Sequence, residues 1–129
     1  MSIPDLVNIG NYVFVGPRVA FTNDQVPSVP KIFNHTYKEL ETHVKDYVMI
    51  GAGAKINSGI ILGEFSFIGL AAVVLCDVPA FAVVAGSPAR IIGDMRDKKY
   101  AALFPELIPI YTQAPYDKLN KATPLHTKE

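Results

Sequence analysis

The sequence predicts an all-β fold, a parallel β-helix built from six-residue steps. Large aliphatic residues recur every six positions, mostly small or β-branched residues stand four positions after each, and glycine follows several aliphatic positions. Neither the 3.6-residue period of a helix nor the two-residue period of a strand gives this spacing. A period of six is typical of a parallel β-helix, in which short strands and turns alternate and the coils stack. The aliphatic positions are Val44, Ile50, Ile56, Leu62, Ile68 and Val74; the second positions are Val48, Ala54, Ile60, Ser66, Ala72 and Val78; the glycines are Gly51, Gly63 and Gly69.

The same pattern occupies the first part of the chain. Its aliphatic and aromatic positions are Ile3, Ile9, Val15 and Phe21, with Val7, Val13 and Val19 in the second position. Each step should place one bulky side chain at an interior corner of the coil, and glycine allows the backbone to turn where a Cβ would clash. At three steps per coil, the ten steps predict about three coils, stacked ~4.8 Å apart.

Composition excludes several classes of protein. Half of the 129 residues are apolar and 19% are charged, which is enough to form one core. The 12 basic residues balance the 12 acidic ones, so no excess of charge indicates a nucleic-acid or membrane-surface partner. No apolar run reaches the ~18–20 residues that a spanning helix needs, the first residues lack a signal-peptide pattern, and the single cysteine, Cys76, cannot form an internal disulfide. We therefore expect a cytoplasmic protein.

The repeat is interrupted between residues 22 and 43. This segment is rich in proline, asparagine and aspartate, as turns and loops are. An excursion of this length in a compact domain is usually functional or disordered. It carries His35 and His43, and a loop on a rigid scaffold is a natural place for a site. The alternative is a flexible insertion whose histidines are solvated.

The pattern divides the chain into a β-helix over residues 1–93 and a C-terminal region over residues 94–129. Residues 94–104 have the composition of a short helix, and Pro105 is expected to end it. The remaining residues contain further prolines and many polar side chains, so we expect an extended tail.

Residues 85–90, Ala-Gly-Ser-Pro-Ala-Arg, resemble the segment that closes the last coil in the left-handed β-helix acyltransferases. More narrowly, residues 11–17 (NYVFVGP), 21–24 (FTND) and 63–65 (GEF) resemble the branch of that family that N-acetylates amino sugars on nucleotide carriers. The resemblance covers roughly residues 7–93. It implies a left-handed coil, a homotrimer, acetyl-CoA as the acyl donor and an active site between adjacent subunits.

The resemblance also assigns candidate cofactor residues. Small residues at turns would let the pantetheine arm of CoA lie close to the backbone, whose N–H groups are donors for a developing oxyanion. The phosphates of CoA need cationic partners, for which Arg90 is the main candidate, with Lys98 and Lys99 as helpers. The small residues are Gly51, Ala52, Gly69 and Ala71.

The acceptor depends on the residues after Phe21. Relatives that acetylate a hydroxyl carry a histidine near the equivalent of Asp24, whereas this chain has none there. A hydroxyl needs a positioned base, and a neutral amine needs far less help. The sequence therefore favours an amine acceptor, oriented by Asn23, with Asp24 or Glu64 contacting the sugar or the proton. The alternative interpretation of Asn23 is an ordinary turn residue in a polar loop.

Three other functions are compatible with parts of the pattern. An O-acetyltransferase would use His35 as its base. A metal-dependent hydrase would need histidines facing one another from successive coils, and none of His35, His43 and His126 is expected in a regular step, so no metal is predicted. A non-catalytic β-helix that only assembles is the third alternative.

Overall fold

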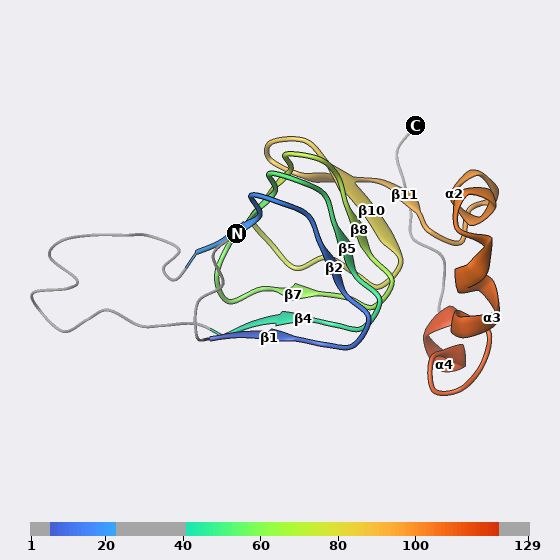
Figure 1. Cartoon of the computed structure of the whole chain (residues 1–129). Helices are drawn as coiled ribbons and strands as arrows, with labels where there is room; N and C mark the ends of the chain where they lie inside the picture. Colours follow the sequence, from blue (N-terminus) through green and yellow to red (C-terminus); the bar gives the residue numbers. More distant parts are fainter. Residues whose placement is uncertain (1–5, 23–40, 122–129) are drawn as a thin grey trace, which may run out of the picture.

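The computed structural model describes residues 6–22 and 41–121, which form a β-helix followed by a group of short helices (Figure 1). The strands are β1 (Val7–Ile9), β2 (Phe14–Val15), β3 (Ala20–Phe21), β4 (Thr42–Val44), β5 (Met49–Ile50), β6 (Lys55–Ile56), β7 (Ile61–Leu62), β8 (Phe67–Ile68), β9 (Val73–Val74), β10 (Ala82–Ala85) and β11 (Arg90–Asp94). The helices are α2 (Lys98–Leu103), the 3₁₀-helix η1 (Pro105–Leu107), α3 (Ile108–Tyr111) and α4 (Asp117–Asn120).

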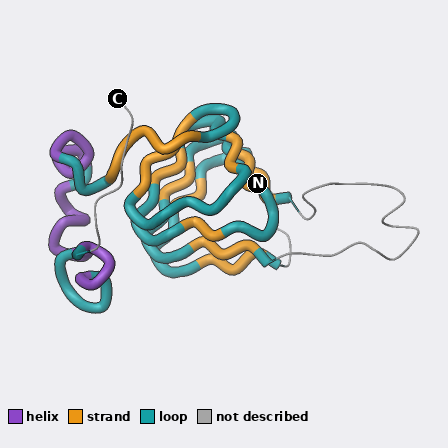
Figure 2. The backbone as a smooth tube through the Cα atoms, turned by 180° about the vertical axis from the view of Figure 1, so that it is seen from behind, coloured by secondary structure: helices purple, strands orange, loops and turns teal. Residues whose placement is uncertain are grey.

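Successive strands from β1 to β10 belong to different sheets, as a β-helix requires. The sheets have the orders β1-β4-β7, β2-β5-β8-β10-β11 and β3-β6-β9, and the strands pair in parallel except for the antiparallel pair β10–β11. Met49 pairs with Phe67 and Lys55 with Val73, so each strand meets the strand three steps further along the chain. The stacked coils are visible as strands and turns in regular alternation (Figure 2). These parallel sheets confirm the hexapeptide β-helix and are consistent with a left-handed coil; the number of coils stays a prediction.

The aliphatic positions of the repeat line the interior, as predicted. Ile50, Ile56, Leu62 and Ile68 are completely buried and belong to one core cluster. Ile9 differs, because it is 39% exposed. It lies on β1, which is the edge strand of its sheet among the described residues. Interior positions at the end of a stack are covered on one side only, which explains the difference.

Glycine permits the coils to approach one another. A Cβ on Gly51 would lie 2.8 Å from the backbone nitrogen of Leu70 in the next coil. A Cβ on Gly63 would meet the backbone of residues 79 and 80 in the same way. These contacts give a packing reason for glycine directly after an aliphatic interior residue.

Two corners of the β-helix repeat a left-handed backbone conformation. The first corner, between β1-β4-β7 and the sheet that contains β2 and β5, holds an aromatic residue at each level. The second corner, between that sheet and β3-β6-β9, holds small residues and one arginine. The positive φ angles at the first corner are 58° at Tyr12, 62° at Tyr47, 62° at Phe65 and 67° at Phe81; at the second they are 61° at Arg18, 74° at Gly53, 57° at Ala71 and 97° at Gly86.

The C-terminal region differs from the prediction. β11 continues to Asp94, so the first helix starts at Lys98. The expectation of an extended tail is wrong for the described residues after Pro105, because η1, α3 and α4 follow. Pro105 and Pro109 each occupy the first turn of a helix, where a missing N–H group costs nothing. The prediction that Pro105 ends the first helix is confirmed, because α2 stops at Leu103, but Pro105 also begins the next helix, which was not predicted from the sequence.

Candidate functional site

One hollow lies beside the first corner of the β-helix, and we call it the first hollow. It has a volume of about 390 Å³. Strands β1 and β4, the turn after β4 and the turn after β7 supply its walls. The lining residues are Asn8, Ile9, Gly10, His43, Val44, Lys45, Asp46 and Glu64. Glu64, predicted from the sequence to contact the acceptor, therefore lies among several charged side chains and an imidazole.

His43 corrects the predicted end of the excursion. It lies in β4, paired with Asn8 on one side and Ile61 on the other, so it belongs to a regular step. Thr42 and Val44 are 1% and 2% exposed and point inward, which leaves the His43 side chain on the outer face. The expectation that His43 is a loop residue was wrong because the polar pair Thr42–His43 resembles a loop. The alternation with Val44 was the signal for a strand.

His43 has a carboxylate neighbour that is itself held by β1. The Glu41 Oε2 atom lies 3.8 Å from His43 Nε2, with side-chain exposures of 60% and 37%. Asn8 Nδ2 donates a 3.1 Å hydrogen bond to Glu41 Oε1. Asn8, Glu41 and His43 therefore form a row of polar side chains from β1 to β4.

Asp46 is fixed by two hydrogen bonds. The Tyr116 hydroxyl and the Asn11 backbone N–H each donate to its carboxylate at 2.7 Å. These bonds, with Tyr116 contributing most, lower the pKa of Asp46. The Tyr116–Asp46 hydrogen bond is also the main cause that raises the pKa of Tyr116 to about 12. Asp46 is thus an ionised structural group that joins the first corner to the C-terminal helices.

A second hollow lies at the C-terminal end of the β-helix, with a volume of about 580 Å³. Its walls are mainly apolar and come from β10, β11 and the segment after β9. The lining residues are Cys76, Asp77, Val78, Val84, Ala89, Arg90, Ile91 and Ile92. Arg90, the predicted partner of the CoA phosphates, stands exposed at this hollow. Asp77 closes the last coil by accepting a 2.9 Å hydrogen bond from the backbone N–H of Ile61.

The small residues predicted to bind the cofactor share the second corner. Gly51 and Ala52 lie in the turn after β5, and Gly69 and Ala71 lie one level above them in the turn after β8. The Ala71 N–H donates to the Ala52 carbonyl at 2.9 Å, which stacks the two turns. The next level is the turn that contains Gly86 and leads to Arg90. The structure therefore arranges these four residues in a column that runs toward Arg90.

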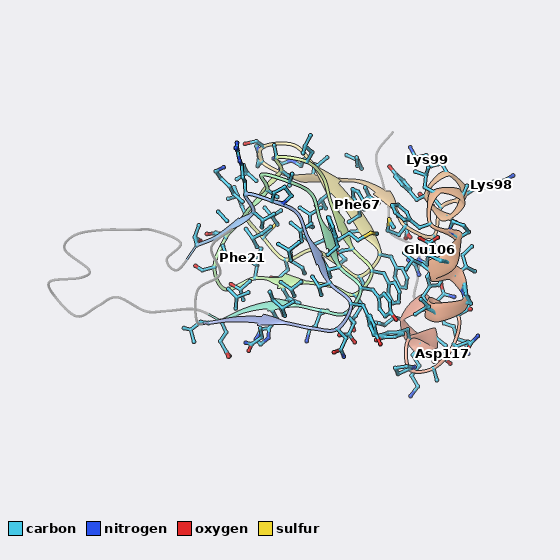
Figure 3. The ribbon with its side chains drawn as sticks, in the orientation of Figure 1. Phe21, Phe67, Lys98, Lys99, Glu106 and Asp117 are labelled. Carbon is cyan, nitrogen blue, oxygen red and sulfur yellow. The ribbon has the colours of Figure 1, made fainter. Side chains whose placement is uncertain are left out.

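The predicted helpers of Arg90 lie elsewhere. Lys98 and Lys99 are exposed on α2 and extend away from the β-helix (Figure 3). Lys99 Nζ lies 4.9 Å from the centre of the Tyr100 ring, in a cation–π contact. Their contribution to phosphate binding stays a prediction.

Three of the predicted site residues, Asn23, Asp24 and His35, lie outside the described residues. The described chain stops at Thr22 after β3 and resumes at Glu41 before β4. Thr22 Oγ1 accepts a 3.0 Å hydrogen bond from the backbone N–H of Ser58, which ties the last residue before the excursion to the next coil.

Within residues 6–22 and 41–121, no group of three or more histidine, cysteine, aspartate or glutamate side chains is arranged to hold a metal ion. Over the same residues, no helix has the length and apolar character needed to cross a membrane.

The fold and the hexapeptide repeat define this chain as a parallel β-helix protein. Comparisons with known sequences and solved structures narrow that class. No family model matches the chain. A putative acetyltransferase of Schizosaccharomyces pombe is 36% identical over 88 residues, which are 67% of this chain and 42% of that protein. A 2,3,4,5-tetrahydropyridine-2,6-dicarboxylate N-acetyltransferase of Clostridium perfringens is 46% identical over 55 residues, 43% of this chain and 23% of that protein.

The structural comparison agrees. The solved structure of a galactoside acetyltransferase in complex with coenzyme A superposes with a TM-score of 0.62 and 29% sequence identity, over 72% of this chain and 47% of that one. The chain thus spans less than half the length of each of these three proteins. Together the likenesses support the hexapeptide-repeat acetyltransferases as the family of this chain.

Proposed function

We propose that the chain is an acetyl-CoA-dependent acyltransferase that N-acetylates the amino group of a nucleotide-linked amino sugar, in the biosynthesis of a surface polysaccharide. The observation that carries the acyltransferase activity is the hexapeptide β-helix, together with its likeness to a galactoside acetyltransferase that binds coenzyme A. The amino-sugar acceptor rests on residues 21–24 and on Glu64 in the first hollow.

The donor is assigned to the second corner. Small residues there leave room for a pantetheine arm along the column that runs from Gly51 and Ala52 to Gly69 and Ala71. Arg90, near the C-terminal end of this column, supplies a guanidinium for the phosphates of CoA. The protein positions the carrier, and the thioester supplies the reactivity.

The acceptor and donor groups lie on different corners of one chain. Glu64 lies in the turn after β7, whereas the cofactor column follows β5 and β8. A site that needs both groups is therefore expected between adjacent copies, with the second corner of one subunit against the first hollow of the next. This arrangement supports the homotrimer that the resemblance implies.

The chemistry is an acyl transfer to nitrogen. The amine lone pair attacks the thioester carbonyl, a C–N bond forms, the C–S bond breaks and the CoA sulfur leaves with a proton. Asn23 orients the amine, and Asp24 or Glu64 contacts the sugar or the incoming proton. A cytoplasmic location and the lack of metal, nucleic-acid and membrane partners stay predictions.

O-acetylation of a sugar hydroxyl is the second candidate, and His43 in the first hollow favours it, because a hydroxyl needs a positioned base. On the sequence alone that base was His35. A protein that only assembles would bind no CoA.

The test is a mass-spectrometric screen for acetyl transfer to matched panels of amino and hydroxy nucleotide sugars. We expect products from amino sugars only. Asn23→Ala should lower kcat about 30- to 1000-fold with CoA affinity unchanged, since a lost positioning hydrogen bond costs ~2–4 kcal/mol in the transition state. His35→Ala should cost under ~10-fold, because the amine supplies its own nucleophilicity. Products from hydroxy sugars alone, with His35→Ala or His43→Ala nearly inactive, would establish the O-acetyltransferase instead.

A further inference from the structure

We propose that His43 is the catalytic base that accepts the proton of the acceptor, and that Glu41 is its positioning residue. This inference rests on the acyl transfer proposed above and assigns one step of it to a strand of the β-helix. It differs from the assignment of the base to the excursion, where His35 was the candidate.

The first argument is rigidity. The His43 backbone N–H donates to the Ile60 carbonyl at 3.0 Å, and β4 is paired on both sides, with β1 and with β7. The neighbours Thr42 and Val44 are anchored in the interior. A general base must stand within hydrogen-bond distance of the proton it removes, so a side chain on a doubly paired strand is better positioned for that task than one on a long loop.

The second argument is orientation. Glu41 faces the Nε2 side of the imidazole at 3.8 Å, and Asn8 holds Glu41 from β1. Because Nε2 lies on the side of the carboxylate, Nδ1 is the ring nitrogen assigned to the acceptor. A carboxylate beside a histidine favours this orientation of the ring.

The third argument is the charge of the first hollow. The charged side chains that face it are Lys45 and Asp46 from the turn after β4 and Glu64 from the turn after β7, with Glu41 beside His43. Three carboxylates therefore oppose one ammonium group. Such a surface favours a cationic acceptor, an amino sugar in its ammonium form, over an anionic one. It also places an imidazole where that ammonium must lose a proton before it can react.

Two protons leave the acceptor nitrogen during the reaction. The bound ammonium group first releases one proton to solvent, which leaves a neutral amine, and His43 Nδ1 then accepts the second proton as the C–N bond forms at the thioester carbonyl. The C–S bond then breaks, and the imidazolium returns the proton to the departing CoA thiolate. The products are the N-acetylated sugar and free CoA thiol, and His43 is neutral again.

The experiment compares the pH dependence of kcat/KM in the wild type, His43→Asn, Glu41→Gln and the control Lys55→Asn. Lys55 occupies the equivalent outward position two steps later, on another sheet, and is exposed. We expect His43→Asn to lose ~10-fold in kcat with CoA affinity unchanged, a moderate loss because a neutral amine needs less help from a base than a hydroxyl does. The variant should also lose the acidic limb between pH 5 and 8 that an imidazole base produces. Glu41→Gln should keep the limb and lose a few-fold in kcat with KM unchanged, and Lys55→Asn should match the wild type.

Chemical rescue separates a catalytic role from a structural one. The His43 side chain is partly exposed at an open hollow, so added imidazole should restore part of the activity of a folded His43→Gly protein. If the wild type transfers acetyl groups while His43→Asn stays within threefold of it and keeps the acidic limb, the inference is wrong and the acyltransferase stands. Loss of that limb in His35→Ala instead would also overturn it. A wild type that neither binds CoA nor transfers acetyl groups would overturn the proposed function and this inference together.

Discussion

The first and second corners of the β-helix share a backbone conformation and differ in almost everything else. At both corners one residue per level takes a φ between +57° and +97°. For a residue other than glycine, that conformation costs roughly 1–2 kcal/mol. At the first corner, the residues with this conformation are all aromatic: Tyr12, Tyr47, Phe65 and Phe81.

The rings form a continuous stack, which we call the aromatic stack. Successive ring centres are 5.0, 5.1 and 5.2 Å apart, with interplanar angles of 22°, 1° and 3°. Tyr111 and Tyr116 pack their edges against it, and Phe65 and Phe81 are 0% and 1% exposed. Offset pairs of this kind contribute about 0.5–1.5 kcal/mol each beyond their buried area, which offsets part of the backbone strain.

Arg96 anchors the helices that cover the stack. Its guanidinium lies 4.3 Å from the centre of the Phe81 ring and is paired with the buried Asp94 at 2.7 Å. A third contact, a 3.1 Å hydrogen bond to the Asn120 carbonyl, reaches the end of α4. The helices therefore lie together on the side of the β-helix that carries the first corner (Figure 1).

The second corner has no such cover among the described residues. Leu70 is 75% exposed and Ala71 is exposed. Glycine at two levels lowers the strain without adding a side chain. The comparison teaches that one step geometry supports two kinds of surface: aromatic residues make a corner into a packing surface, and small residues leave it uncovered.

The largest expected effect comes from the interior that both corners enclose. Ile56 is fully buried, so Ile56→Asp places a carboxylate without a partner in the core. The cost of several kcal/mol is comparable to the whole stability of a small domain, ~5–15 kcal/mol. We expect loss of the β-sheet signal in circular dichroism and insoluble expression. The control is Lys55→Asp, one residue away and exposed, which should fold. A soluble Ile56→Asp protein with native circular dichroism would contradict the interior assignment.

The next effect should distinguish the corners directly. Phe65→Ala removes the central, fully buried ring of the aromatic stack and should destabilise the protein by about 3–5 kcal/mol. Ala71→Gly, at a positive φ on the second corner, should change the free energy of unfolding by less than about 1 kcal/mol, because relief of strain and added chain entropy oppose each other. Urea denaturation of both variants measures this. Equal losses would show that the two corners do not differ as described.

A smaller effect concerns the ligand at the open corner. Arg90→Ala should weaken CoA binding about 10-fold, the equivalent of ~1.4 kcal/mol, because one charge-assisted contact to phosphate is lost. The control is Lys118→Ala, which removes an exposed cation from α4. Calorimetric titration with CoA should show a loss for Arg90 only. The same affinity in both variants would remove Arg90 from the cofactor site.

The smallest effect is the bond that joins the first corner to α4. Tyr116→Phe should cost about 1 kcal/mol at pH 7, at the low end for a bond to a charged group, because solvent screens this site. The pKa of Asp46 is lowered in the folded protein, so its stabilisation is present above the unfolded value of ~3.8 and is lost as the pH falls through the folded value. The pKa of Tyr116 is raised to about 12 in the folded protein, so its pH dependence runs in the opposite direction. Its stabilisation is present below pH 10 and is lost as the pH rises from 10 through 12.

Chemical denaturation of Tyr116→Phe and the wild type between pH 2 and pH 8 should therefore give two curves that converge in acid. A difference that stays constant down to pH 2 would mean that the hydroxyl contributes nothing through the ionised carboxylate.

The sequence was sufficient to predict the β-helix because its interior positions repeat without interruption from Val44 to Val74. It also grouped the small residues that prove to share the second corner. The aromatic stack was missed, although it follows a rule: each ring stands three residues after an interior residue, as Tyr47 follows Val44 and Phe65 follows Leu62. The rule applies only at every third step, since one coil has three corners. Comparing each six-residue step with the next one therefore does not reveal the aromatic positions.

The strand at His43, despite its alternation with Val44, and the helices after Pro105 were missed for a different reason. Local composition favoured a loop at His43 and an extended tail after Pro105. His43 lies in a strand because β4 pairs with β1 and β7. The residues after Pro105 form helices that pack against the aromatic stack. Both depend on contacts between residues far apart in the chain, which a local pattern does not contain.

The central claim is that the second corner is the cofactor face, and one measurement tests it most directly. CoA is titrated calorimetrically into the wild type, Ala52→Trp and Tyr12→Trp. Ala52 is half-buried in the cofactor column, whereas Tyr12 is 78% exposed at the end of the aromatic stack, so each variant adds a bulky ring to one corner. We expect Ala52→Trp to lose at least about 10-fold in affinity, because the ring occupies the path of the pantetheine arm, and Tyr12→Trp to bind as the wild type does. Unchanged binding in a folded Ala52→Trp protein would contradict the account.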